Sequence, residues 1–176
     1  MSNFKKKLDR KGQSDWQYKA AATQQIAQAF SRFWKWGELH EQSRVALIPV
    51  PPSKARADAA YDARMYELLS AIATKSGVNL DIRDCLSFSG KYAASHESAA
   101  RPSPADLCEE LSFSNAIGRP SKQPGLIFLF DDMLTTGAHY VAASQVLAEH
   151  FPGVPIVGNF VARRIVPNPF ADFDDE

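Results

Sequence analysis

A short string of acidic, hydroxyl and glycine residues follows an apolar stretch of this chain and could bind a phosphorylated ligand. The string reads Asp131-Asp132-Met133-Leu134-Thr135-Thr136-Gly137-Ala138. It joins the run Leu126–Phe130, which is typical of a buried strand, to a stretch with the pattern of a helix. The two threonine hydroxyls and the free backbone N–H groups at the start of that helix suit an anion such as a phosphate monoester. Gly137 allows the backbone to approach the ligand closely.

The two carboxylates of this string need a different partner, because they would repel a phosphate. They can accept hydrogen bonds from a pair of hydroxyls, or help to hold Mg²⁺. A diol and a phosphate on one small ligand describe a ribose 5-phosphate. The alternative is a structural role, in which Asp131 and Asp132 are ordinary loop acids and Thr136 is the N-cap of the helix.

A second polar loop follows the apolar run Val45–Val50. It begins with two prolines and continues with Ser53, Lys54, Ala55 and Arg56. Backbone amides, one hydroxyl and two cations suit a pyrophosphate. The alternative is a proline-marked turn with surface cations. In open α/β sheets ligands bind beyond the carboxyl ends of the strands, and both loops leave such ends.

The two segments resemble motifs of a known enzyme superfamily. The string that ends at Ala138 resembles the motif with which type I phosphoribosyltransferases bind 5-phosphoribosyl-1-pyrophosphate (PRPP): an apolar strand, two acids, two variable residues, Thr-Thr-Gly and a small residue. The stretch Val-Pro-Pro-Ser-Lys at 50–54, followed by Ala60-Tyr61-Asp62, resembles Pro-x-Pro-x-Ser-Arg … Gly-Phe-Asn-Gln of competence-protein-F-like phosphoribosyltransferases. The resemblance covers most of residues 44–166.

This resemblance implies an enzyme that binds PRPP and Mg²⁺ and displaces pyrophosphate from ribose C1 with an acceptor that the sequence does not identify. It makes Asp131 and Asp132 catalytic residues, which orient the ribose hydroxyls and contact the metal largely through ligand and water. The implied 5-phosphate contacts are Thr135, Thr136, Gly137 and Ala138. The implied pyrophosphate contacts are Ser53, Lys54 and Arg56. Contacts from a lid, or to the leaving group, are expected from Lys91, Arg101 and Arg163. The alternatives are a disordered polar loop for Lys91 and Arg101, and pairing with the acidic tail for Arg163.

The chain departs from these families at three points. It has only two cysteines, Cys85 and Cys108, so it lacks the zinc ribbon that is common at the N-terminus of the competence-type family. The competence-type family has an arginine-rich stretch after the serine, and this chain retains only Lys54, Arg56 and Arg64 as basic residues there. An acid often lies two residues before the motif glycine in purine salvage members. Thr135 has that place here, which disfavours hypoxanthine-guanine-type chemistry.

Two other functions stay open beside the enzyme. One is a non-catalytic module that senses PRPP or a nucleotide on the same fold. The other is a protein-interaction subunit, in which an aromatic N-terminal helix and the charged ends of the chain carry the function. An enzyme would release pyrophosphate with one acceptor, whereas a sensor would bind PRPP and release none.

Bulk composition narrows the class of protein. Lys+Arg and Asp+Glu both number 20, so the net charge does not indicate nucleic-acid binding. No apolar run approaches membrane-spanning length and the N-terminus is polar, so we expect a soluble cytoplasmic protein without a membrane partner. The basic start, from Lys5 to Lys11, and the acidic end, from Asp172 to Glu176, are expected to be solvated, frayed termini.

The order of predicted elements is that of an α/β fold: three layers around a mostly parallel sheet of the type I phosphoribosyltransferase kind, with an extra N-terminal helix. The predicted elements are helix 14–35, strand 45–50, helix 57–76, strand 80–86, a long loop 87–106, short helix 106–113, strand 126–130, helix 138–150 and strand 154–161. One domain is expected over 1–176, with a helical extension or hood at 1–43, a core at 44–166 and an acidic tail at 167–176.

The helix at 14–35 carries Ile26, Phe30, Phe33 and Trp34 on one predicted face. So many large apolar side chains need a surface to cover. That surface is either the main sheet of the same chain or the matching helix of a second copy in a homodimer.

Overall fold

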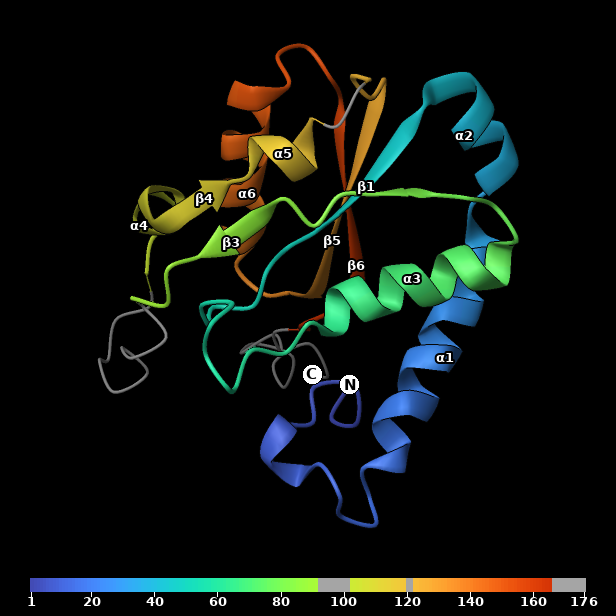
Figure 1. Cartoon of the computed structure of the whole chain (residues 1–176), viewed down its shortest axis with the longest axis vertical. Coiled ribbons are helices and arrows are strands. Elements are labelled where there is room, and N and C mark those ends of the chain that lie inside the picture. Colours follow the sequence, from blue (N-terminus) through green and yellow to red (C-terminus); the bar gives the residue numbers. More distant parts are fainter. Residues whose placement is uncertain (92–101, 120–121, 166–176) are drawn as a thin grey trace, which may run out of the picture.

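The protein has an α/β fold in a computed structural model that describes residues 1–91, 102–119 and 122–165 (Figure 1). Its elements are η1 (Leu8–Arg10), α1 (Gln17–Phe33), α2 (Trp36–Ser43), β1 (Val45–Pro49), α3 (Arg64–Ser76), β2 (Asp81–Ile82), β3 (Leu86–Phe88), α4 (Pro104–Glu110), β4 (Leu111–Phe113), α5 (Asn115–Gly118), β5 (Leu126–Leu134), α6 (Ala138–His150) and β6 (Ile156–Arg163). Among these residues, four strands form an all-parallel sheet in the order β2-β1-β5-β6. The predicted fold class, α/β with a mostly parallel sheet, is confirmed.

The two central strands, β1 and β5, bury both of their faces, as their continuous apolar runs predict. Side chains alternate between the two sides of the sheet. Leu47, Phe128 and Phe130 join α1 and α3 in one hydrophobic cluster. Ile48 and Leu129 join α6 in the other. Figure 1 shows the same layering, with α1 and α3 on one side of the sheet and α6 on the other.

Aromatic residues of the N-terminal helix cover the sheet of the same chain. The ring centroids of Phe30 and Phe130 lie 5.3 Å apart, and those of Trp34 and Phe128 lie 4.7 Å apart. Trp34 Nε1 also donates a hydrogen bond to Asn159 Oδ1 on β6, at 3.0 Å. Phe33 does not share this face, because 73% of its surface is exposed, so its predicted place on the buried face was wrong.

Several predicted elements differ from the structure. The predicted short helix 106–113 is α4 only as far as Glu110, because residues 111–113 extend to form β4 and pair with β3. The predicted strand 80–86 is split into β2 and β3, because Arg83 between them is buried and donates to Asp81 and to the backbone oxygen of Gly118. Strand β3 turns away to pair antiparallel with β4, which was not predicted. The predicted helix 57–76 begins only at Arg64, so the chain from Val50 to Ala63 is an irregular loop over the carboxyl end of the sheet.

The basic N-terminal segment, residues 1–11, is not a frayed tail, so that expectation was wrong. Phe4 is fully buried in the cluster of α1 and α3. Lys5 forms an ion pair with Asp132, and Lys6 forms one with Asp15. The segment lies below the carboxyl ends of β1 and β5 in the view of Figure 1. The acidic tail 167–176 lies outside the described residues.

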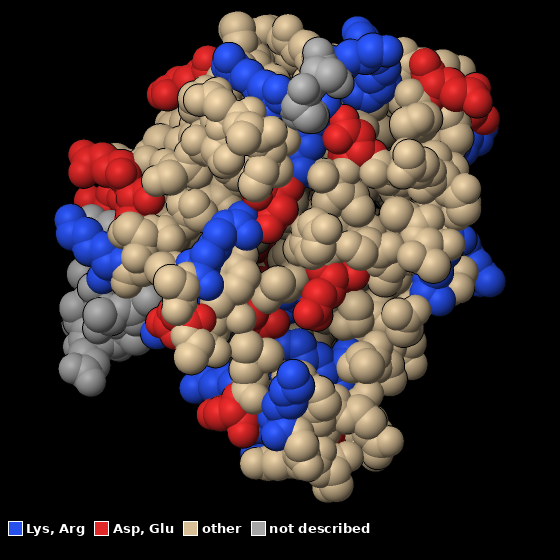
Figure 2. All heavy atoms as spheres, in the orientation of Figure 1, with Lys and Arg blue, Asp and Glu red and all other residues tan. Residues whose placement is uncertain are grey.

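Charge is mixed over the face of the molecule seen in Figure 2, where acidic and basic side chains are interspersed. This agrees with the equal numbers of basic and acidic residues in the chain. In the part of the chain that the structure describes, no helix is long and apolar enough to span a membrane.

The burial of Phe4 is a test of whether the N-terminal segment belongs to the folded core. Phe4→Ala should lower the free energy of unfolding by about 3–5 kcal/mol, the usual cost of removing a buried phenylalanine ring. Phe33→Ala is the matched control, and should change it by less than about 0.5 kcal/mol because that ring is mostly in solvent. Urea unfolding of both variants measures the difference. Equal effects would mean that the segment does not pack as described.

Candidate functional site

A cavity of about 190 Å³ opens at the carboxyl ends of β1 and β5. Four segments form its wall: the loop after β1, the start of α3, the end of β5 with the turn into α6, and the N-terminal segment. The lining residues are Lys5, Val50, Pro51, Pro52, Ser53, Arg64, Asp131, Asp132, Met133, Thr135 and His139. Both loops that the sequence singled out therefore meet here, as parallel strands require.

Two larger hollows, of about 390 and 420 Å³, lie at the opposite end of the sheet. Arg119 and His150 line one of them, and Arg44 and Asp81 line the other. We place the candidate site at the smaller cavity, because that cavity brings a buried acid pair to the start of a helix beyond the carboxyl ends of the strands. Size alone does not identify a site, whereas convergent polar groups do.

Strand β5 carries the two acids on its own extension. It pairs with β1 only as far as Phe130, and the amide of Val50 donates to the Phe130 oxygen at 2.8 Å where β1 diverges. Pairing with β6 continues through Leu134. The sequence predicted that the strand ends at Phe130, which was wrong by four residues. Asp131 and Asp132 are therefore held by a paired strand and not by a loose loop.

Asp131 is largely buried at this edge. Its Oδ1 accepts a hydrogen bond from the backbone N–H of Asp132 at 2.7 Å. Burial, followed by the negative charge of Asp132, raises the pKa of the Asp131 carboxyl to about 6. The two adjacent acids therefore differ: one gains a proton close to neutral pH, and the other has cationic partners.

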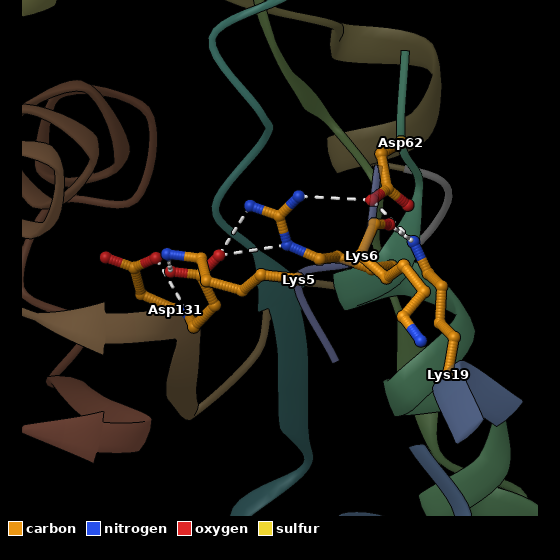
Figure 3. Close-up of polar contacts among 7 residues, drawn as sticks. Lys5, Lys6, Lys19, Asp62 and Asp131 are labelled. Carbon is orange, nitrogen blue, oxygen red and sulfur yellow. Dashed lines mark hydrogen bonds and ion pairs between the residues drawn. The ribbon is translucent and has the colours of Figure 1, made fainter. Parts of the chain in front are cut away.

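Asp132 is the centre of a network of alternating charges, in which Figure 3 labels Lys5, Asp62 and Lys19. Its Oδ2 accepts from Arg64 Nε at 2.9 Å and from Arg64 Nη2 at 2.5 Å, and its Oδ1 lies 2.7 Å from Lys5 Nζ. Arg64 also donates to Asp62 at 3.2 Å, and Lys19 donates to Asp62 at 2.6 Å. These ion pairs link the end of β5 to the start of α3, to α1 and to the N-terminal segment.

Sequence reasoning did not identify Lys5 and Lys19 as parts of this site. Lys19 could have been noticed, because it lies at helical spacing from Thr23 and Ala27 on the buried face of α1. A lysine on such a face needs an acidic partner, and Asp62 is that partner. Lys5 carries no comparable signal, because it lies in a run of three lysines.

The turn between β5 and α6 has the form that a phosphate contact needs. Thr135 and Thr136 are exposed, and Gly137 has a φ of 79° as the N-cap of α6. Only glycine adopts that backbone conformation without strain. The amide of Ala138 makes one long contact, 3.4 Å, to Thr136 Oγ1. The start of α6 thus offers backbone N–H groups, the positive end of its dipole and nearby threonine hydroxyls to an anion.

The loop after β1 places its three predicted contacts differently. Ser53 lines the cavity. Lys54 lies 3.5 Å from Asp58 on the same loop. Arg56 donates to Asp84 Oδ2 at 2.6 Å and to the backbone oxygens of Asp84 and Leu86. Neither cation lines the cavity, and Arg56 holds the loop against the chain that leads into β3.

Of the three predicted lid or leaving-group contacts, the structure describes Lys91 and Arg163. The backbone N–H of Lys91 donates to Glu110 Oε1 at 2.6 Å, and the preceding Gly90 packs against Ala55 of the loop after β1. Gly90 and Lys91 therefore lie beside that loop, and Arg101 lies outside the described residues. Arg163 is exposed at the end of β6 and does not line the cavity.

The ring of His139 contacts Phe88 edge to face, with centroids 5.8 Å apart. Burial lowers the pKa of its imidazole. The ring therefore tends to be neutral while it lines the cavity, and it can act as a donor or an acceptor there.

Comparison with known proteins gives a structural likeness and no sequence match. No protein-family model matches the chain, and no curated protein matches it. Two crystal forms of a hypoxanthine phosphoribosyltransferase from Staphylococcus aureus are similar in structure. The tetragonal form is 11% identical with a TM-score of 0.46, over 85% of this chain and 76% of that one. The orthorhombic form is 10% identical with a TM-score of 0.42, over 84% and 76%.

The raised pKa of Asp131 makes stability depend on pH. A carboxyl whose pKa rises from 3.8 in the unfolded chain to about 6 on folding stabilises the fold below pH 4, and this is lost as pH rises through 6. Asp131→Asn removes this dependence and keeps an oxygen that can accept from the Asp132 amide. Its stability relative to wild type should therefore rise by roughly 2–3 kcal/mol between pH 4 and pH 7.

Denaturant unfolding across that pH range measures the difference. Asp58→Asn is the control of opposite sign: a hydrogen bond from the Ala60 amide lowers the pKa of Asp58, so this variant should lose stability relative to wild type as pH rises. A difference between Asp131→Asn and wild type that does not change with pH would contradict the described burial of Asp131.

Proposed function

We propose that the protein binds PRPP in the cavity at the carboxyl ends of β1 and β5, on a fold of the type I phosphoribosyltransferase kind. One observation carries this proposal. The acid pair, the start of α6 and the loop after β1 line or adjoin a single cavity, so a diol site, a phosphate site and a second polar loop lie within reach of one small ligand.

Each part of the ligand has a matching part of the cavity. Asp131 and Asp132 accept hydrogen bonds from the ribose hydroxyls. The 5-phosphate binds at the turn from Thr135 to Ala138, where N–H groups and hydroxyls converge. The pyrophosphate lies toward Ser53 and the amides of its loop. In an enzyme, this arrangement would act by positioning C1 and by stabilising the departing pyrophosphate.

The residues of the cavity fit Mg²⁺ only as an ion that arrives with the ligand. The described residues hold no group of three or more His, Cys, Asp or Glu side chains that could bind a metal by themselves. Magnesium is commonly held by one or two carboxylates together with phosphate oxygens and water, and Asp131 and Asp132 can provide that share. When bound, the ion would neutralise the charge of the pyrophosphate.

The proposal has a second part, which is that the phosphoribosyl group is transferred from PRPP to an acceptor. Thr135 lines the cavity where an acid would act on a purine base, so we propose an acceptor other than hypoxanthine or guanine. The likeness to competence-protein-F-like enzymes is carried by the loop after β1, and it does not name an acceptor either.

A sensor without catalysis is the second candidate, and the pairing of Asp132 with two cations favours it. Two cations already neutralise that carboxylate, and Arg64 occupies one of its oxygens with two donors. A site built only for tight binding can tolerate such pairing. A screen of nucleobases and amines for PRPP-dependent pyrophosphate release separates the two: release with any acceptor identifies the enzyme, and binding without release identifies the sensor.

The enzyme and the sensor share one claim, that the protein binds PRPP at this cavity, and titration calorimetry with PRPP and Mg²⁺ tests it. Asp132→Asn should weaken binding at least about 30-fold, because charge-assisted hydrogen bonds to the ligand are lost. The matched control is Asp62→Asn, which breaks the same charge network on the other side of Arg64 but does not line this cavity. Both variants should lose stability, since each leaves a cation without its partner.

Only Asp132→Asn should lose affinity for PRPP. Equal affinity in the two variants would remove Asp132 from the ligand site. No binding of PRPP by the wild-type protein would reject the proposed function.

A further inference from the structure

The N-terminal segment holds one lysine in the candidate site by fixing the chain on either side of it. Phe4 is fully buried among the side chains of α1 and α3. The Lys6 ammonium donates to the backbone oxygen of Asp15 at 2.6 Å, and the Lys6 oxygen accepts from Lys19 Nζ at 3.0 Å. With its neighbours fixed in this way, the side chain of Lys5 extends into the cavity (Figure 3).

The two cations that neutralise Asp132 are held very differently. Arg64 is locked, because Asp62 and Asp132 hold it from both sides with three hydrogen bonds. Among the described residues, Lys5 forms one ion pair, 2.7 Å from Nζ to Oδ1, and 36% of its side chain is exposed. The flexible four-carbon stem of a lysine lets its ammonium move several ångströms without any change in the backbone.

A ligand hydroxyl that needs Asp132 must therefore use Oδ1, since Arg64 occupies Oδ2 with two donors. It either shares Oδ1 with Lys5 or displaces the ammonium from it. In both cases the ammonium stays inside the cavity with donors to spare, because an ammonium has three. A ligand with a pyrophosphate group brings several negative charges to the same place, beside two carboxylates that repel them.

We infer that Lys5 is a ligand-binding residue of this site, and that its ammonium passes from Asp132 to the pyrophosphate of the bound ligand. This inference rests on the proposed function. It assigns to the N-terminal segment the cation that Lys54 and Arg56 do not supply, because those two side chains lie outside the lining of the cavity. It also explains why a lysine is held at the edge of a buried acid pair: Lys5 neutralises Asp132 in the empty site and the pyrophosphate in the filled one.

The test compares two ligands that differ only in the pyrophosphate. Titration calorimetry of Lys5→Met should show PRPP binding weakened about 10-fold to 100-fold, the value of a charge-assisted hydrogen bond in a partly desolvated site. Binding of ribose 5-phosphate, which lacks the pyrophosphate, should change by less than about 3-fold or become tighter. Lys5→Arg should recover most of the loss, because it restores the charge.

Lys7→Met is the matched control, since it removes the same charge from an exposed position two residues away. It should bind both ligands as the wild type does. If Lys5→Met fails to fold, Lys5→Gln removes the charge and keeps a donor for Asp132, and the same selective loss of PRPP affinity is expected.

Unchanged or tighter binding of PRPP by the Lys5 variants would overturn this inference and leave the proposed function standing. Equal losses for PRPP and ribose 5-phosphate would also overturn it, because Lys5 would then act on the ribose phosphate and not on the pyrophosphate. If the wild-type protein binds neither ligand, the proposed function fails first, and the role of Lys5 fails with it.

Discussion

The neutralisation of one buried carboxylate, that of Asp132, organises this edge of the molecule. A carboxylate that is 7% exposed cannot stay ionised without partners, because the cost of taking its charge out of water is several kcal/mol. Arg64 at the start of α3 and Lys5 of the N-terminal segment supply those partners. Arg64 in turn needs Asp62, which also neutralises the buried Lys19 of α1. One acid thus determines how several distant segments meet.

This constraint also explains why the candidate site is preformed. Strand β5 runs past the end of β1 and stays paired with β6, so the backbone that carries the acids is fixed on one side. Ion pairs fix their side chains on the other. Asp131 lies beside this network, and its pKa rises because of burial and the adjacent charge of Asp132. Preorganised groups of this kind bind a ligand without first paying for their own ordering.

Much of the fold could be predicted from sequence, because local patterns determine it. The apolar runs at 45–50 and 126–130 predicted the two central strands, and α6 begins and ends where its pattern predicted. The short strands β3 and β4 could not be found in this way, since each has only three residues and they pair across a long stretch of sequence. The motif after β5 identified the residues of the acid pair and the turn, but placed the end of the strand too early.

The remaining parts of the site depend on contacts between distant residues, which no local pattern shows. Nothing near Lys5 in the sequence indicates Asp132, which lies far along the chain in the fifth strand. Arg56 illustrates the opposite error. A cation beside a polar loop suggested a pyrophosphate contact, yet its donors bind Asp84 and Leu86 and hold that loop in place. Its assignment to pyrophosphate stays a prediction. Of the three predicted pyrophosphate contacts, Ser53 is the one that lines the cavity.

The central claim is that PRPP binds between the end of β5, the start of α6 and the N-terminal segment, and hydrogen–deuterium exchange tests it most directly. Addition of PRPP and Mg²⁺ to the wild-type protein should slow amide exchange at Thr135–Val141, in the loop after Val50 and around Lys5. Amides beside the hollows near Arg119 and Arg44 should exchange at their former rates. Protection confined to those hollows, or no protection anywhere, would contradict the claim.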